Sequence, residues 1–264
     1  MAPPDHVLAA FGVGPPARLL PGGQRTSWRA AGLVLKPVGD LAEAQFVADT
    51  LAVLPEQGFR VPRPVRSVAG SWVVDGWSAF SWVAGAEAGD RYDEVISAGA
   101  AFHRALSTWE RPSFLDGRDD PWSYGDRVAW SELPVEGDEP MLHRLAALRR
   151  PVSARSQLVH GDLGGNVLLA PGLAPAIIDW PPYWRPVVWA TAVVAVDALS
   201  WSGADLTLVD RWAHLPEWDQ MLLRAEMYRL ATREGFLRRG VDLTEQNAAH
   251  RGTVDAICAR LTAT

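Results

Sequence analysis

The hydrophobic pattern of the chain changes from strand-like to helical near residue 85, and this change restricts the folds available to it. From about 17 to 83, short runs rich in β-branched and aromatic residues are separated by Gly and Pro, as in "GLVLKPV" at 32–38. From about 87 onward, apolar residues recur mainly at helical spacing. We therefore expect an α+β protein with a small antiparallel β lobe followed by a larger, mainly helical lobe.

One helix is expected inside the β region, because apolar residues within 41–54 fall near helical spacing and Asp40 is suited to cap the first turn. We place the N-terminal lobe at 1–83 and the C-terminal lobe at 84–264, with a hinge at about 81–86. A short strand-like segment at 156–180 interrupts the helical region. The helices expected around it span 88–108, 138–149, 187–202, 204–213, 217–237 and 243–262.

Composition limits the class of protein. The chain has 264 residues, of which 48% are hydrophobic and 21% charged, as in globular proteins. Its formal net charge of −6 argues against a nucleic-acid partner, since nucleic-acid-binding domains are usually basic. No run reaches the roughly 18 apolar residues of a membrane span, and the first residues lack the basic start of a secretory signal. A cytoplasmic protein without a membrane partner is expected, and the oligomeric state is left open.

The strand-like segment contains the polar residues best suited to chemistry. It holds Asp162 in "HGD", then Asn166, and then Asp179 at the end of the apolar run "AIID". One carboxylate can accept the proton of an attacking hydroxyl, while an amide and a second carboxylate can hold Mg²⁺ at a phosphoryl-transfer site. Alternatively, "HGD" is a turn with a capping Asp, and Asp179 is an ordinary carboxylate at the end of a strand. The order of all three residues favours the site.

The motifs "HGDLGGN" and "IIDW" resemble those of the aminoglycoside phosphotransferase and choline-kinase-like family of small-molecule kinases. The resemblance covers most of the chain and implies a two-lobed, protein-kinase-like fold. It also implies that Asp162 is the catalytic base and that Asn166 and Asp179 are the Mg²⁺ ligands. His160 more often has a structural role in such loops. ATP as the phosphoryl donor follows from the same resemblance.

Lys36 is the only lysine among 25 basic residues, which chance alone can also produce. In the family that the chain resembles, a lysine on the third strand contacts the α- and β-phosphates and is held by a helix glutamate. The resemblance assigns these roles to Lys36 and Glu43. Asp49 is a less suitable partner for Lys36, and Glu43 has an alternative role in complementing the helix dipole.

Further nucleotide contacts are implied in the N-terminal lobe. The segment "LPGGQRTS" resembles the turn that covers the triphosphate in this family, and "FSWVAG" resembles the hinge whose backbone binds adenine. A Gly-Gly turn is also common in ordinary hairpins. The residues assigned to these contacts are Gly22, Gly23, Thr26, Ser27, Ser81 and Val83.

Three features depart from the family pattern. The loop from Asp162 to Asn166 is one residue shorter than usual, although its two glycines can compensate. The aspartate that normally braces this loop has no clear equivalent, since Asp197 comes late in the chain. The segment "PPYWRP" places Tyr183, Trp184 and Arg185 where the substrate side begins. A divergent subfamily with its own substrate is therefore expected.

The residues of the C-terminal lobe leave the acceptor open. Aromatic rings beside carboxylates suit a sugar or amino sugar, whereas the same residues can also be core tryptophans and the solvated faces of helices. The tryptophans in question are Trp180, Trp184, Trp189, Trp201, Trp212 and Trp218. The acidic residues are Asp205, Asp210, Glu217, Asp219 and Glu226.

These inferences together predict an ATP- and Mg²⁺-dependent phosphotransferase acting on a hydroxyl of a small polar molecule, such as a sugar, an amino sugar or an aminoglycoside-like compound. The alternative is a nucleotide-binding pseudokinase with a regulatory or scaffolding role. A protein kinase is disfavoured, because the stretch 180–186 is too short for an activation loop and no A-P-E-like segment follows it.

Overall fold

Six short strands form the sheet of the N-terminal part in the computed structural model, which describes residues 1–21 and 26–263. The sheet has the order β1-β2-β3-β6-β4, with β5 also paired to β6, and all the pairings are antiparallel. Its strands are β1 (Arg18–Leu19), β2 (Trp28–Ala30), β3 (Leu33–Pro37), β4 (Pro64–Val65), β5 (Val73–Val74) and β6 (Trp77–Ser81). The antiparallel β lobe expected from the sequence is therefore present.

Helix α2 (Leu41–Val53) crosses this part of the molecule and begins where the sequence predicts. The side chain of Asp40 accepts a hydrogen bond from the backbone N–H of Glu43, which caps the first turn. A short helix that the sequence analysis did not anticipate, α1 (Asp5–Ala10), packs Val7 and Leu8 into a small core with Leu35 of β3. The buried side chains of α2 do not join this core. Val47 and Leu51 of α2 belong instead to the larger core of the C-terminal part.

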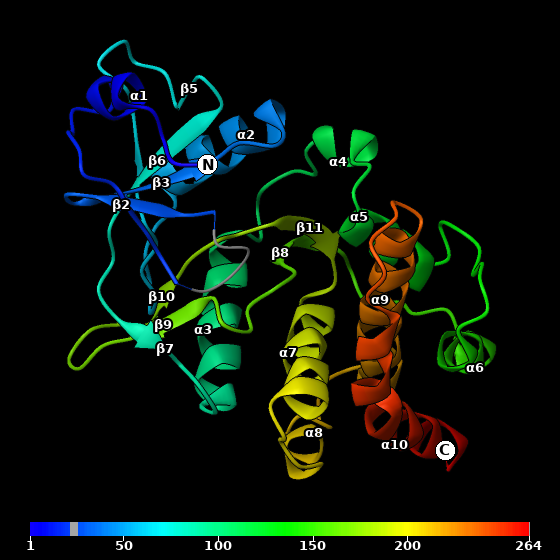
Figure 1. The fold of residues 1–264 in the computed structure, drawn as a ribbon. Coiled ribbons are helices and arrows are strands. Elements are labelled where there is room, and N and C mark those ends of the chain that lie inside the picture. The colour runs from blue at the N-terminus through cyan, green and yellow to red at the C-terminus, as the bar shows by residue number, and fades with distance from the viewer. Residues whose placement is uncertain (22–25, 264) are drawn as a thin grey trace.

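The C-terminal part is mainly helical, and its long helices α7 and α9 lie side by side (Figure 1). Both helices bury most of their residues, which explains why neither shows a polar face in its sequence. The helices are α3 (Tyr92–Ala105), α4 (Phe114–Gly117), α5 (Pro121–Ala129), α6 (Pro140–Leu148), α7 (Val187–Trp201), α8 (Thr207–Arg211), α9 (Trp218–Leu237), the 3₁₀ helix η1 (Thr244–His250) and α10 (Arg251–Thr262).

Two small sheets position the polar segment. Strands β7 (Ala86–Glu87), β9 (Val167–Leu169) and β10 (Ala176–Ile177) form one of them, in the order β10-β9-β7. Strand β8 (Gln157–His160) pairs antiparallel with β11 (Pro182–Arg185) in the other. Figure 1 shows β8 and β11 between the N-terminal sheet and the helices α7 and α9. The sequence did not predict β11, because its run "PYWR" has two large aromatic residues but no alternation.

Each expected helix has a counterpart in the structure, in the same order and with ends that differ by a few residues, whereas α1, α4 and α5 were not expected. The exception is 243–262, which divides into η1 and α10. Helix α5 was not predicted, although Asp120 and Ser123 form a capping box at its start and Pro121 follows the cap. The described residues include no helix that is both long and apolar enough to cross a membrane.

Candidate active site

The loop with Asp162 and Asn166 connects β8 to β9 and closes despite its short length. The backbone N–H of Asn166 donates to the carbonyl of Leu163 at 3.0 Å, forming a turn. Gly165 occupies this turn at φ +74°, a conformation that favours glycine. The amide Nδ2 of Asn166 donates to the carbonyl of Asp162 at 2.7 Å and lies 3.4 Å from its Oδ2. The shortened loop therefore holds the two residues together.

The imidazole of His160 connects this loop to the segment that precedes Asp179. Its Nε2 lies 3.0 Å from the carbonyl of Ile178, and its Nδ1 accepts from the backbone N–H of Asp162 at 3.1 Å. The backbone N–H of His160 in turn donates to Nε2 of His103. Burial lowers the pKa of both histidines, that of His103 to about 3. Each imidazole is therefore neutral near pH 7 and links backbone segments, as the sequence analysis expects for His160.

Lys36 and Asp179 meet although 143 positions separate them in the chain. The Nζ of Lys36 donates to Oδ1 of Asp179 at 2.8 Å, from a side chain that is 24% exposed. Desolvation raises the pKa of Asp179, but the charge and the hydrogen bond of Lys36 outweigh it and hold this pKa below its ordinary value. Asp179 also has φ +53°, and strained backbone of this kind often marks functional sites.

The expected ion pair between Lys36 and Glu43 is corrected by the structure. The carboxylate of Glu43 lies 3.6 Å from Nε of Arg118, a residue of the C-terminal part. Burial raises the pKa of Glu43, against the lowering effect of Arg118. Glu43 therefore pairs with a basic residue, but with Arg118 instead of Lys36. The sequence gave no indication of Arg118, because this contact joins segments far apart in the chain. Asp49, the other candidate partner of Lys36, accepts from Nε1 of Trp72 at 2.7 Å.

The oxygen atoms of this site suit Mg²⁺. Because Nδ2 of Asn166 donates to Asp162, its Oδ1 remains available as a ligand. Lys36 bonds to Oδ1 of Asp179, so Oδ2 of Asp179 likewise remains available as a ligand. Mg²⁺ is usually held by one or two such groups together with phosphates and water. The described residues contain no group of three or more His, Cys, Asp or Glu arranged for a metal, so a protein-only cage is not what this site offers.

Arg229 is a site residue that the sequence analysis missed. From the middle of α9, its Nη2 donates to Oδ1 of Asp162 at 2.7 Å. Two further bonds join the same guanidinium to both carboxylate oxygens of Asp197. A Cβ atom on Gly164 would lie 3.5 Å from Oδ2 of Asp197, which places that carboxylate against the loop. Asp197, considered too late in the chain to brace the loop, is therefore linked to it through Arg229.

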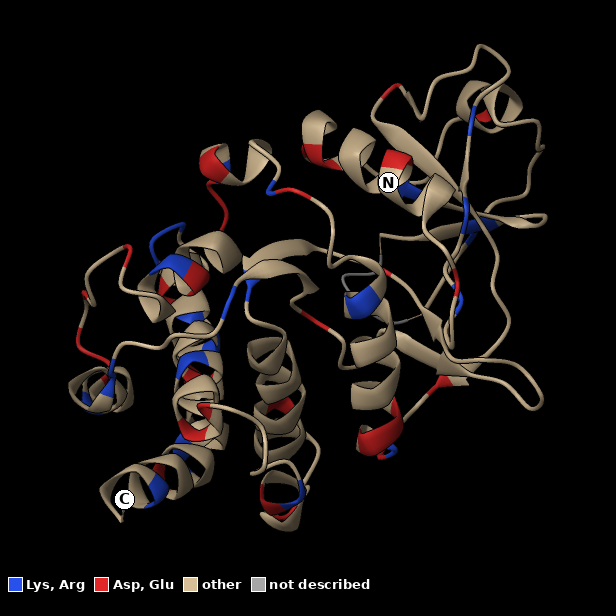
Figure 2. Ribbon diagram, turned by 180° about the vertical axis from the view of Figure 1, so that it is seen from behind, with Lys and Arg blue, Asp and Glu red and all other residues tan. Residues whose placement is uncertain are grey.

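Helix α9 carries the basic and acidic residues of this interior, and both kinds recur along it in Figure 2. Burial lowers the pKa of Arg229, but the neighbouring carboxylates of Asp197 and Asp162 outweigh it and raise this pKa. Glu226 and His250 form a second, fully buried pair at 2.7 Å. A buried guanidinium that faces two carboxylates is held by charge-assisted hydrogen bonds in one orientation. Because Arg229 bonds to Oδ1 of Asp162, Oδ2 of that carboxylate has only the longer contact of 3.4 Å to Nδ2 of Asn166.

The remaining acidic candidates have structural partners. Asp210 and Asp219 both pair with Arg260, at 2.7 Å each. The carboxylate of Glu217 accepts hydrogen bonds from the backbone N–H groups of Ser153 and Ala154. Asp205 accepts one from the backbone N–H of Thr207, and Glu226 is buried with His250. These residues therefore match the alternative of structural helix residues, and they do not form an acidic wall.

Most of the tryptophans singled out are also structural. Trp180, Trp189 and Trp218 are buried in the large core, and Trp212 donates from Nε1 to Asp93. Trp201 is exposed, and Trp184 is half-buried beside a pocket. Trp184 is thus the one of these six rings that lines a described pocket.

The segment assigned as the hinge joins β6 to β7, and its adenine contacts through Ser81 and Val83 stay predictions. Ser81 ends β6, where its hydroxyl accepts from the backbone N–H of Arg63 at 2.8 Å, and Val83 follows in the connection. Gly85 has φ +147°, and a Cβ there would lie 2.8 Å from Cβ of Leu168. The connection therefore passes so close to β9 that only glycine fits.

The assigned triphosphate turn is described only in part. Gly22 and Gly23 lie outside the described residues. Thr26 is exposed and Ser27 half-buried just before β2, and the carbonyl of Ser27 accepts from the backbone N–H of Leu20 at 2.9 Å. The hydroxyls of both residues stay predicted phosphate contacts.

The family model and the solved structures that resemble this chain all point to phosphotransferases and related kinases. A model of the phosphotransferase enzyme family matches residues 24–182. An aminoglycoside phosphotransferase structure from Alicyclobacillus acidocaldarius has a TM-score of 0.65 at 17% identity, covering 99% of this chain and 96% of that one. A choline/ethanolamine kinase family protein from Mesorhizobium loti has a TM-score of 0.59 at 17% identity, covering 98% and 95%.

A third similar structure is a thermostable mutant of an aminoglycoside phosphotransferase, in ternary complex with ADP and hygromycin B. It has a TM-score of 0.64 at 15% identity and covers 98% of each chain. Among curated proteins, none is similar enough in sequence to count as a relative. At these identities the structures establish a shared kinase-like fold, and the two-lobed α+β fold predicted from the sequence is confirmed.

Proposed function

This chain belongs to the phosphotransferase enzyme family, and from that premise we propose that it transfers the γ-phosphoryl group of ATP, with Mg²⁺, to a hydroxyl of a small polar molecule. The observation that carries the proposal is the contact of 2.8 Å between Lys36 and Asp179. It brings the sole lysine of the chain and a strand-end carboxylate to one place beside the Asp162 loop. The similar structures support ATP as the donor, because they are two phosphotransferases and a kinase family protein. One of the two phosphotransferases is a complex with ADP.

The residues of the loop have complementary tasks in this reaction. The acceptor oxygen attacks the γ-phosphorus, the bond from that phosphorus to the bridging oxygen breaks, and ADP leaves. Oδ2 of Asp162 receives the acceptor proton, while Arg229 holds Oδ1. Lys36 supplies a compact positive charge for the α- and β-phosphates. Correct positioning of the two substrates provides much of the acceleration in phosphoryl transfer.

Asn166 and Asp179 would hold Mg²⁺ through Oδ1 and Oδ2, respectively. The ion, when bound, neutralises charge on the phosphates and orients them. The contact between Lys36 and Asp179 then has a consequence. Nucleotide and metal compete with it for both side chains, so binding would replace one ion pair with contacts to phosphate and Mg²⁺.

Two variants test this assignment. Asp162→Ala should leave Mg·ATP binding within about threefold of wild type and abolish transfer, whereas Asp179→Ala should weaken Mg²⁺-dependent nucleotide binding itself by at least about tenfold. Titration calorimetry with a non-hydrolysable ATP analogue, with and without Mg²⁺, measures both. Asp49→Ala is the matched control, because this exposed carboxylate of α2 bonds to Trp72 instead. Equal nucleotide affinity in wild type and Asp179→Ala would rule out the metal role.

A nucleotide-binding pseudokinase is the second candidate, and the pairing of Glu43 with Arg118 is the observation that favours it. In this arrangement Lys36 lacks its expected glutamate, so the phosphate contact is incomplete. Transfer of ³²P from ATP to any member of a panel of sugars, sugar acids and amino sugars would identify an enzyme. Tight Mg·ATP binding without transfer or hydrolysis would identify the pseudokinase.

A further inference from the structure

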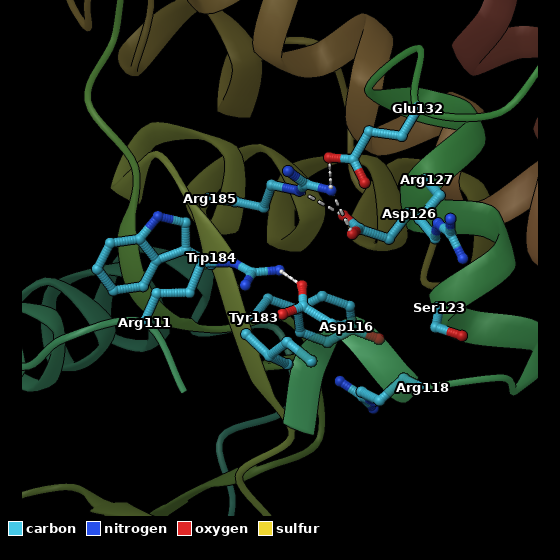
Figure 3. A pocket seen from close by; sticks show the side chains of 11 residues that line it. Arg111, Asp116, Arg118, Ser123, Asp126, Arg127, Glu132, Tyr183, Trp184 and Arg185 are labelled. Atoms are coloured by element: carbon cyan, nitrogen blue, oxygen red, sulfur yellow. Dashed lines mark hydrogen bonds and ion pairs between the residues drawn. The ribbon is translucent and has the colours of Figure 1, made fainter. Parts of the chain in front are cut away.

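A cavity of about 280 Å³ lies between α4, α5 and β11, and none of the residues assigned to catalysis, nucleotide or Mg²⁺ lines it. Figure 3 shows its wall, with the side chains of Arg111, Arg118, Arg127 and Arg185 around it and the indole ring of Trp184 on one side. The volume is close to the lower end of small-molecule pockets, which begin at roughly 300 Å³. It therefore suits one end of a small molecule and is too small for a whole multi-ring antibiotic.

The pocket borders the Asp162 loop. Tyr183 lines it, and the ring of Tyr183 packs so closely on Gly161 that a Cβ there would lie 2.3 Å from a ring carbon. Gly161 directly precedes Asp162. Arg118, whose guanidinium lies 5.1 Å from the centre of the Tyr183 ring, contacts Glu43 of α2. The pocket therefore lies at the boundary of the two lobes, one side chain away from the loop.

The carboxylates of the pocket wall are all engaged by arginines. Asp116 pairs with Arg111 at 2.7 Å. Asp126 and Glu132 both pair with Nη2 of Arg185, at 2.6 and 2.8 Å. Figure 3 draws these contacts as dashed lines. An ammonium group entering the pocket would have to compete with an arginine for each carboxylate, so the wall is poorly suited to an amino sugar.

Arg127 differs from the other arginines of the wall. Its guanidinium makes no hydrogen bond or ion pair with any described residue, and its side chain is exposed on α5. Arg118, by comparison, donates to the carbonyl of Pro182 at 2.9 Å and lies near Asp120 and Glu43. The charged group of the pocket wall that remains available to a ligand is therefore the positively charged guanidinium of Arg127. The whole chain carries a net charge of −6, so its overall charge does not attract anions. The unpaired guanidinium of Arg127 is therefore a local feature of this pocket.

We infer that this pocket binds a carboxylate or phosphate group of the acceptor, with Arg127 as the anchoring residue and Trp184 as an apolar wall. That the bound molecule is the phosphoryl acceptor rests on the proposed function. The inference narrows the class of acceptor to anionic polyols. A guanidinium presents two parallel N–H donors that match the two oxygens of either group. The engaged carboxylates of the wall keep amines out, which adds selectivity between acceptors of opposite charge.

Binding without nucleotide tests the site separately from catalysis. The probes are D-gluconate, D-glucitol 6-phosphate, neutral D-glucitol and cationic D-glucamine, which share a polyol chain and differ in charge. Titration calorimetry should show the two anions binding at least about tenfold more tightly than the neutral and cationic probes. The carboxylate and phosphate probes also show which of the two anions the site prefers. Failure of both anions to bind, or tighter binding of D-glucamine, would overturn the inference.

Arg127→Gln should weaken anion binding by about tenfold to a hundredfold, as expected when a charge-assisted hydrogen bond is lost. Arg251→Gln is the matched control, because Arg251 is another exposed helical arginine and lies outside the pocket. Both variants should melt at the wild-type temperature, since both side chains are exposed and neither pairs with another described residue. Equal anion affinity in Arg127→Gln and wild type would overturn the inference.

A transfer assay with ATP and Mg²⁺ separates the two proposals. If the anions bind through Arg127 and no probe is phosphorylated, the anion site stands and the proposed kinase reaction fails. If D-glucitol is phosphorylated as fast as the anions and Arg127→Gln leaves the rates unchanged, the kinase reaction stands and the anionic acceptor is wrong. Phosphorylation of an anion with a raised KM in Arg127→Gln is the result expected from both proposals.

Discussion

The guanidinium of Arg229 donates to the carboxylate of Asp162 at 2.7 Å across 67 positions of the chain. The same guanidinium is fixed by two hydrogen bonds to Asp197 of α7. The orientation of the proposed base is therefore set by a pair of packed helices in addition to its own short loop. This arrangement leads to the first prediction.

Arg229→Lys should lower kcat by about tenfold to a hundredfold while changing the KM for ATP by less than about threefold. Lysine keeps the positive charge but loses the planar fork that joins Asp162 to Asp197, so the base is less well oriented. Steady-state kinetics measure both constants. Arg233→Lys, one helical turn further along α9, is the control, and its own hydrogen bond runs to the carbonyl of Arg229 and not to the loop. A rise in the KM for ATP with an unchanged kcat would contradict this positioning role.

Arg118→Gln should free the carboxylate of Glu43 and strengthen Mg·ATP binding by a few fold. Arg118 now lies 3.6 Å from Glu43, and without that positive charge the glutamate is available to Lys36 once nucleotide draws the lysine from Asp179. Titration calorimetry with a non-hydrolysable analogue measures the change. The double variant Arg118→Gln/Glu43→Gln should lose the gain. An equal gain in the double variant would show that Glu43 is not the cause.

Gly85→Ala should lower the free energy of unfolding by about 2–4 kcal/mol, because the new Cβ meets Leu168 at 2.8 Å and the backbone has φ +147°. Urea denaturation followed by tryptophan fluorescence gives the value. Gly32→Ala is the matched control in the N-terminal sheet, since a Cβ there meets nothing within 4 Å and φ is not positive. Similar losses in both variants would show that the hinge is not tightly constrained.

The stability of the protein should fall as the pH falls from about 6.5 toward 3, in part because of His103. Burial lowers the pKa of His103 to about 3, so in this window the unfolded chain binds a proton that the folded chain does not. The free energy of unfolding therefore decreases with falling pH, by up to about 4–5 kcal/mol over the whole window for this group. Below about pH 3 the contribution of His103 adds no further loss.

His103→Gln should make this dependence shallower, because glutamine can accept the same backbone hydrogen bond without titrating. Urea denaturation at pH 7, 6, 5 and 4 compares the slopes. His214→Gln is the control, since His214 is exposed and its substitution should leave the slope unchanged. A slope that is identical in wild type and His103→Gln would show that another group causes the acid sensitivity.

Local signals explain what the sequence could predict. The cap at Asp40 and the helix after it depend on neighbouring residues, and both are present. The "HGDLGGN" motif fixes a turn whose hydrogen bonds are also local. The approach of Lys36 to Asp179 was expected only because the family resemblance supplied the fold, since no local pattern joins residues so far apart.

Contacts between distant segments explain what the sequence could not predict. Arg229 is one of six charged residues in α9, and nothing in its spacing separates it from the others. The pairing of Glu43 depends on Arg118, which lies in the irregular segment between α4 and α5. Strand β11 exists because β8 offers it a partner, so its own sequence carries little signal. Tertiary context decides each of these cases.

Helix α2 shares the core of the C-terminal part, and the backbone of Arg60 bonds to the segment that enters β10. These contacts anchor the rear of the N-terminal part, including α2 and Glu43, to the helical part. The sheet that carries Lys36 has a small core of its own, although Phe80 of β6 also packs against the large core. Any closure of the lobes around a nucleotide would therefore move the outer strands of the sheet more easily than α2, and it would change the separation of Lys36 and Glu43.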